Sequence, residues 1–287
     1  MKSFIREYWW EPNILDLVSE KFRQFSYAVK GMPLLKELIK RKDPVIIAGQ
    51  GGSGTRLVAQ ILKKSNQFGL LFSSADTLDS FSYRSCGLNN GDLMISLLSQ
   101  THSLDYKIDQ VEPALKQKID FCCERLIENI ISEGRAPSLW GWKEPLMMFW
   151  LPFMRAHFPD MKFIHIIRDV RSIRKKHFQG SEKLYLEYFA DPVECGQRER
   201  FEKIWSSLNL DILAWSKKNL PRKYYMQKIE DLTGENRKEA IEDLLCFTGL
   251  KRENVDKLAG LAKTLRPFEA TPRSGIVAKA LEVFGYI

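Results

Sequence analysis

The sequence has few cysteines and no long apolar run, and both absences narrow the class of protein. Its five cysteines are odd in number and unevenly spaced, unlike the ligands of a zinc site or the pairs of a disulfide framework. No segment approaches the roughly 20 apolar residues of a transmembrane helix. Residues 1–20 also lack the apolar core of a signal peptide. We therefore expect a cytoplasmic protein with reduced thiols and no membrane span.

The sequence also lacks the signatures of nucleic-acid binding, although it is basic. Lys and Arg outnumber Asp and Glu by 44 to 36, which gives a formal net charge of +8. This excess is spread along the whole chain. No zinc-finger spacing, basic zipper helix or aromatic RNA-binding motif accompanies it. The charge therefore favours an anionic small ligand, and we expect no nucleic-acid partner.

The length and composition predict a single α/β domain over residues 1–287, of which 44% are hydrophobic. Short apolar runs at 45–48 and 162–167 are typical of buried parallel strands, and 224–229 is strand-like. Residues 83–136 are expected to form an insertion with polar loops and a helix. Apolar spacing predicts a helical lead-in within residues 1–42 and helices from Arg56, over 149–158, around Trp205 to Trp215 and over 235–249.

A glycine-rich loop follows the first predicted strand and precedes a predicted helix. In such a loop, backbone amides and the helix dipole converge on an anion. Glycines let the main chain approach phosphate oxygens, and hydroxyl side chains add donors. Ligands of open parallel sheets bind at the carboxyl ends of strands, so this loop and Arg168, which ends the second strand, should share one crevice. The residues predicted to hold a phosphate are Gly51, Gly52, Ser53, Gly54, Thr55 and Arg56.

The loop also has the glycine spacing of a Walker motif, through Gly49 and Gly54. A Walker loop places Lys after its final glycine, whereas this chain has Thr55 and Arg56 there. The triphosphate interpretation thus lacks its key charge. A small-molecule kinase stays as an alternative, and so does a nucleotide-binding protein without catalytic activity.

Several segments resemble the sulfotransferase family. The Ser-Gly-Thr turn at 53–55, with a basic residue and a Leu-rich helix after it, is similar to that family's 5'-phosphosulfate loop. Arg168-Asp169 after a strand resembles its 3'-phosphate motif, which has a Ser eight positions after the Arg; here that position is Lys176. Gly141-Trp142-Lys143-Glu144-Pro145 is similar to the Lys-x-Pro segment of tyrosylprotein, heparan-type and many bacterial members. A weaker likeness covers 228–232 and 247–250, and it supports the fold more than the chemistry.

The resemblance implies a parallel-sheet, P-loop-like sulfotransferase fold with helical insertions. It also implies 3'-phosphoadenosine 5'-phosphosulfate as the donor, a small-molecule or glycan acceptor bound partly by 83–136, and no metal. Lys143 would reach the donor's sulfate and bridging oxygen, where a cation stabilises the charge that grows on the leaving group.

Other roles follow from the same resemblance. Arg168, Lys176 and Arg273 would bind the 3'-phosphate. If a helix starts soon after Arg168, Ser172 lies one turn from Lys176 and is an alternative partner. The catalytic base is expected at Asp76 or Asp79, although Asp is also a common helix N-cap. His177 is a lesser candidate for the base.

Overall fold

The computed structural model describes residues 44–71, 90–120, 139–174, 196–262, 265 and 273–287. The predicted lead-in at 1–42 lies outside these residues. The predicted base candidates Asp76, Asp79 and His177 also lie outside them, and so does Lys176, the predicted 3'-phosphate ligand. Their roles stay predictions.

A five-stranded parallel sheet in the order β2-β3-β1-β4-β5 forms the centre of the molecule. The strands are β1 (Val45–Ala48), β2 (Gly69–Leu71), β3 (Trp140–Lys143), β4 (Lys162–Ile167) and β5 (Tyr224–Lys228). Within β1, Ile47 pairs with Lys143 on one side and with Ile164 on the other. The predicted α/β class with a parallel sheet is confirmed, including the strands at 45–48 and 162–167.

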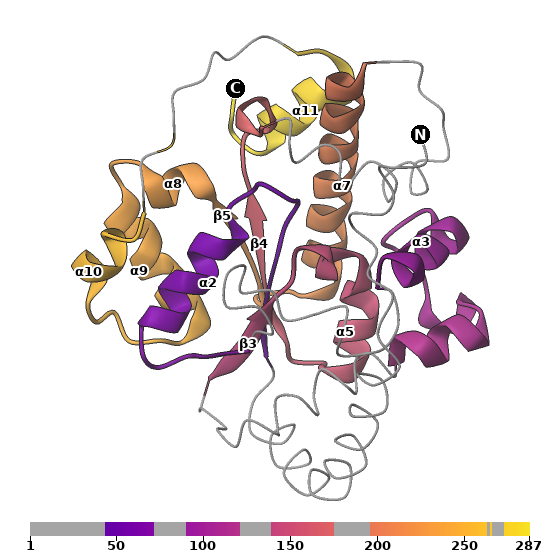
Figure 1. Ribbon diagram of the computed structural model, residues 1–287, viewed down its shortest axis with the longest axis horizontal. Coiled ribbons are helices and arrows are strands. Elements are labelled where there is room, and N and C mark those ends of the chain that lie inside the picture. Colours follow the sequence, from indigo (N-terminus) through magenta and orange to yellow (C-terminus); the bar gives the residue numbers. More distant parts are fainter. Residues whose placement is uncertain (1–43, 72–89, 121–138, 175–195, 263–264, 266–272) are drawn as a thin grey trace, which may run out of the picture.

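Helices cover both faces of this sheet (Figure 1). One face packs against α2 (Thr55–Lys64), α8 (Ile229–Thr233), α9 (Arg237–Thr248) and α10 (Val255–Ala259). The other packs against α3 (Asn90–Thr101), η2 (Pro145–Trp150), α5 (Leu151–His157) and α7 (Gln197–Asn219). A third apolar cluster joins α7 to α11 (Gly275–Val283).

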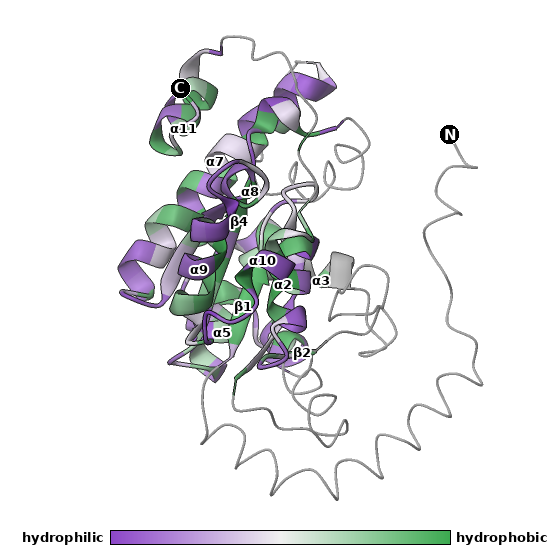
Figure 2. Ribbon diagram, turned by 90° about the vertical axis from the view of Figure 1, so that its left-hand side faces the viewer, coloured by the Kyte–Doolittle hydropathy of each residue, from purple (hydrophilic) through white to green (hydrophobic). Residues whose placement is uncertain are grey.

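Alternation along the strands explains the two cores. Ile46 and Ala48 belong to the cluster on the α5 and α7 side, whereas Val45 and Ile47 belong to the cluster on the α2 and α9 side. Successive strand residues point to opposite faces, so a run of four apolar residues suits a strand that is covered on both sides. In Figure 2 the central strand β1 is hydrophobic, and hydrophilic residues lie on the outer helices α8 and α9.

Several predicted helices have different bounds in the structure. The helix expected over 149–158 is divided into the 3-10 helix η2 and α5, and the helix expected over 235–249 is α9, which Gly249 ends with a φ of 83°. The described part of the predicted insertion is largely helical, with α3, the short η1 (Ile108–Gln110) and a helical stretch over 113–120. Residues 121–138 lie outside the described residues. In the part of the chain that the structure describes, no helix has both the length and the apolar character that a membrane crossing needs.

Candidate functional site

The glycine loop forms a tight turn between β1 and α2. Gln50 O accepts a hydrogen bond from Ser53 N at 3.0 Å, and Gly52 between them has a φ of 89°. Gly54 precedes α2 as its N-cap with a φ of 97°, and no side chain caps the helix there. These left-handed values favour glycine. The loop therefore presents backbone and a helix N-terminus at the carboxyl end of β1, as an anion site requires.

Two polar side chains in this loop are buried and have no hydrogen-bond partner among the described residues. Gln50 and Ser53 are each 1% exposed. Within the described residues, Gln50 Nε2, Gln50 Oε1 and Ser53 Oγ make no hydrogen bond. Leaving such a group unsatisfied costs about 1–3 kcal/mol, and native proteins rarely do so without a functional reason. Sequence reasoning missed Gln50, although an amide directly after a buried strand and among glycines was a visible signal.

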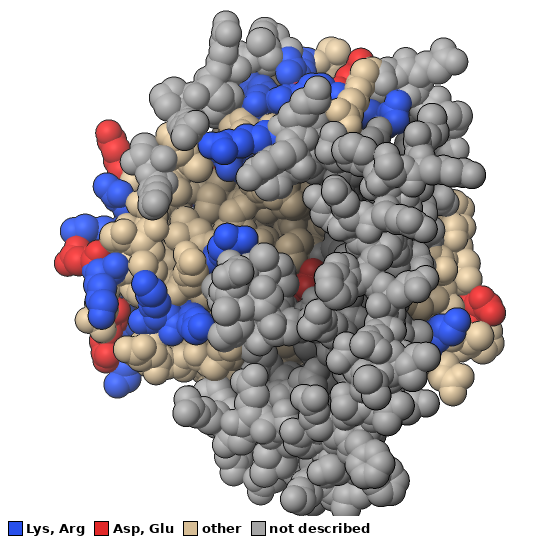
Figure 3. Space-filling model, in the orientation of Figure 1, with Lys and Arg blue, Asp and Glu red and all other residues tan. Residues whose placement is uncertain are grey.

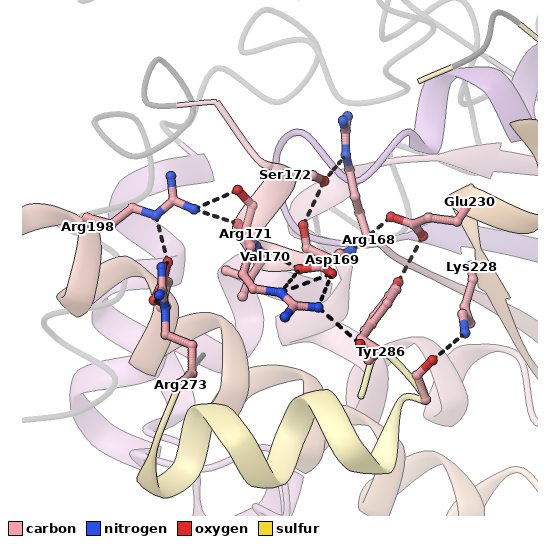
Figure 4. Close-up of polar contacts among 12 residues, drawn as sticks. Arg168, Asp169, Val170, Arg171, Ser172, Arg198, Lys228, Glu230, Arg273 and Tyr286 are labelled. Carbon is pink, nitrogen blue, oxygen red and sulfur yellow. Dashed lines mark hydrogen bonds and ion pairs between the residues drawn. The ribbon is translucent and has the colours of Figure 1, made fainter. Parts of the chain in front are cut away.

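Arg168 lies against the same loop. It follows β4, the neighbour of β1, and its Nη1 donates to Gly52 O at 3.4 Å. Its Nε donates to Ser172 Oγ at 2.8 Å, and that hydroxyl donates to Asp169 O at 2.8 Å (Figure 4). Burial lowers the pKa of the Arg168 guanidinium. The glycine loop and Arg168, which the sequence predicts to share one crevice, are thus in contact.

Three nearby arginines are paired with carboxylates. Arg171 Nη2 contacts Asp169 at 2.7 Å, and Arg198 Nε contacts Glu202 at 2.6 Å. Arg273 also donates to Glu202, at 2.9 Å through Nη2. Burial alone raises the pKa of Glu202, but hydrogen bonds from Arg273 and Arg198 outweigh it and lower that pKa overall. Arg273, the predicted 3'-phosphate ligand, is thus held by a carboxylate of α7 in this structure.

Arg168 differs from these three arginines. Among the described residues it has no carboxylate within ion-pair distance, and its Nε and Nη1 donate to the neutral oxygens of Ser172 and Gly52. A partly buried guanidinium without a counter-ion attracts an anion. In the space-filling view this face is hollowed near the glycine loop, and Lys and Arg side chains lie at the rim of the hollow (Figure 3).

Lys143 is the last residue of β3, at the carboxyl ends of the strands where the glycine loop and Arg168 also lie. It is 3% exposed and stands beside Ile47 of β1, while Glu144 N donates to Ile47 O at 3.0 Å. Gly141 allows this close pairing, because a Cβ there would lie 1.9 Å from Val45 O. The glycine loop, Lys143 and Arg168 therefore follow three adjacent strands, β1, β3 and β4, at their carboxyl ends. In doubly wound sheets this edge is where ligands bind.

The sequence profile of the sulfotransferase family matches residues 44–254 of the chain, which contain the loop, Lys143 and Arg168. The chain belongs to the sulfotransferase family. No curated protein sequence gives a match.

Solved sulfotransferase structures are similar to it. STF1 from Mycobacterium tuberculosis is 16% identical, with a TM-score of 0.49 over 91% of this chain and 82% of that one. STF9 from Mycobacterium avium is 12% identical, with a TM-score of 0.46 over 82% and 70%. The sulfotransferase domain from the curacin biosynthetic pathway is 14% identical, with a TM-score of 0.46 over 86% and 98%.

The sequence places Ser172 one turn from Lys176, as an alternative partner of the 3'-phosphate, on the condition that a helix starts soon after Arg168. Among the described residues, which here run to position 174, that condition is not met: the 3-10 turn η3 (Val170–Ser172) follows Arg168, and Ile173 is extended with φ −73° and ψ 132°. Asp169 is the N-cap of this turn, and its side chain accepts from Arg171 N. Ser172 contacts Arg168, whereas Lys176 lies outside the described residues, so both roles stay predictions.

The C-terminal residues also reach this site, and nothing in the sequence indicated it. Tyr286 donates its hydroxyl to Glu230 Oε2 at 3.0 Å, and its carbonyl accepts from Arg171 Nη2 at 3.0 Å (Figure 4). Glu230 Oε1 in turn accepts from Asp169 N at 3.0 Å. Lys228 Nζ donates to Gly285 O at 3.0 Å and lies 4.8 Å from the centre of the Tyr286 ring. The turn that carries Arg168 is therefore braced by α8 and by the residues after α11.

Proposed function

We propose that this sulfotransferase uses 3'-phosphoadenosine 5'-phosphosulfate as its donor and transfers the sulfuryl group to a hydroxyl or amine of a small-molecule or glycan acceptor. The glycine loop, residues 51–56, would hold the 5'-phosphosulfate. Arg168 with Ser172 would hold the 3'-phosphate, and Lys143 would stand at the transferred group.

The observation that carries this proposal is the set of contacts that Arg168 makes. Its guanidinium touches the glycine loop at Gly52 and has no carboxylate partner among the described residues, while Arg171, Arg198 and Arg273 around it are paired. A donor with phosphates at both its 3' and 5' positions places one anion on the loop and a second beside it. The Gln50 and Ser53 side chains, which have no hydrogen-bond partner within the described part of the chain, further support a polar ligand at the loop.

The chemistry follows from these positions. The acceptor oxygen or nitrogen attacks sulfur in line, a new bond to sulfur forms, and the bond from sulfur to the bridging oxygen breaks. The acceptor proton passes to a base, and adenosine 3',5'-bisphosphate leaves with an added negative charge. The Lys143 ammonium would stabilise that charge, which is greatest in the transition state. The base is predicted at Asp76 or Asp79.

A thermal-shift comparison of two nucleotides tests the donor class. A ligand that binds only the folded state raises the melting temperature, and at a given concentration a tighter ligand raises it further. We expect stabilisation by adenosine 3',5'-bisphosphate without magnesium and little by adenosine 5'-monophosphate. Arg168→Ala should erase that preference, whereas Arg155→Ala, which removes an exposed arginine of α5, should keep it.

Two outcomes would contradict the proposal. Stabilisation by ATP with magnesium, and none by the bisphosphate, would favour the kinase alternative. Binding of the bisphosphate without transfer from labelled donor to any acceptor in a panel of sugars, phenols, lipids and peptides would indicate a nucleotide-binding relative that lacks catalytic activity.

A further inference from the structure

Glu230 is a partly buried carboxylate close to the arginine that should bind the 3'-phosphate. Burial lowers the pKa of Arg168, and the charge of Glu230 is the strongest of the attractions that oppose this effect. The two side chains nevertheless form no ion pair. Each oxygen of Glu230 accepts from another donor, Oε1 from Asp169 N and Oε2 from Tyr286 Oη, both at 3.0 Å (Figure 4).

Tyr286 is well fixed for this contact. Its backbone N donates to Leu281 O at 2.7 Å, its carbonyl accepts from Arg171, and Lys228 lies over its ring. Burial, followed by the charge of Glu230, raises the pKa of the Tyr286 hydroxyl, so it keeps its proton at neutral pH and can act only as a donor toward a carboxylate.

We propose, on the basis of the function proposed above, that Tyr286 is a positioning residue for donor recognition. Its hydroxyl occupies Glu230 Oε2 and so keeps this carboxylate from pairing with Arg168. The guanidinium then stays available to the 3'-phosphate. Without the hydroxyl, Glu230 Oε2 would lose the donor that Tyr286 supplies, and Arg168 is a neighbouring cation that would take its place. An internal carboxylate would then compete with the phosphate for the same arginine.

Tyr286→Phe tests this role, because it removes only the oxygen and keeps the ring. We expect the affinity for adenosine 3',5'-bisphosphate to fall by about tenfold, the scale of one hydrogen bond to a charged group, while the affinity for adenosine 5'-monophosphate stays the same. The ratio of the two affinities does not depend on the folded fraction, since unfolded protein lowers both apparent affinities equally. Tyr225→Phe, which removes another partly buried hydroxyl from β5, is the control and should keep the ratio.

A second substitution separates competition from simple loss of packing. Adding Glu230→Gln to Tyr286→Phe removes the competing charge but keeps a carbonyl oxygen for Asp169 N, so the preference for the bisphosphate should return. The proposal is overturned if Tyr286→Phe retains the full preference, or if the double variant stays as weak as the single one. A wild-type protein without any preference for the bisphosphate would instead overturn the proposed donor itself, before either variant is made.

Discussion

Lys143 is the residue whose charge should matter most in the reaction. It is almost fully buried at the end of β3, so substitution by Ala would remove packing as well as charge. Lys143→Met keeps most of the volume. Turnover should fall by roughly a hundredfold or more, as for other preorganised transition-state donors, while binding of the bisphosphate product changes little.

The measurement is kcat with labelled donor, next to the dissociation constant of adenosine 3',5'-bisphosphate. Lys217→Met, at an exposed position of α7, is the control for loss of a lysine. A fall in turnover of less than about threefold would remove Lys143 from the mechanism.

Gln50 allows a test in which stability and binding should move in opposite directions. Since its buried amide has no partner among the described residues, Gln50→Leu should raise the free energy of unfolding by about 1–3 kcal/mol in the absence of ligand. The same change should weaken bisphosphate binding. Urea denaturation and a binding titration measure the two effects.

Gln227 is the matched control. It is also buried, but its Nε2 donates to Lys228 O at 2.8 Å and its Oε1 accepts from Tyr225 Oη at 3.2 Å. Gln227→Leu should therefore destabilise the protein. If Gln50→Leu destabilises it to the same extent, the Gln50 amide has a structural partner and is not a ligand-binding group.

At the scale of elements, the fit between the glycine loop and α8 sets the geometry of the site. Gly54 has a φ of 97°, and a Cβ there would lie 2.5 Å from Ile229 Cδ1. Gly54→Ala combines left-handed strain with overpacking, so we expect a loss of about 2–4 kcal/mol in unfolding free energy. Gly51→Ala, which meets nothing within 4 Å, should cost far less. Equal losses for the two variants would show that the loop does not depend on close packing against α8.

The elements differ in how far their sequences predict them. β1 and β4 are apolar runs with a glycine or a charged residue at their ends, and a buried parallel strand needs little more. β2 and β3 are harder to predict. β2 has only three residues, and β3 needs Gly141 because of the carbonyl of Val45, which belongs to another strand. The loop and Arg168 were predictable because each follows a recognisable strand. The contact of Tyr286 with Glu230 was not, because it depends on where α11 packs against α7.

At the scale of the whole molecule, a buried histidine should link stability to pH. His165 of β4 contacts Asn209 of α7 at 2.8 Å and Tyr224 of β5 at 3.0 Å. Burial lowers its pKa to about 4 from an ordinary value of 6.5. Below pH 6.5 this histidine is protonated in the unfolded chain but stays neutral in the folded protein. The free energy of unfolding should therefore fall by about 3 kcal/mol between pH 6.5 and 4.

Urea denaturation at a series of pH values checks this expectation. His165→Gln should reduce the slope in that window, even if it lowers stability at pH 7. A wild-type protein whose unfolding free energy stays level from pH 7 to pH 5 would contradict the assignment.

The central place of β1 in the sheet has a kinetic consequence. Val45 pairs with Gly141 and Lys162, which come about 100 residues later in the chain, and such long-range parallel pairing makes folding slow. The glycine loop gains its second wall, the turn with Arg168, only when β4 joins. We therefore expect the nucleotide to bind the native state and not the folding transition state. We expect adenosine 3',5'-bisphosphate to slow unfolding and to leave the refolding rate unchanged, as measured by stopped-flow mixing.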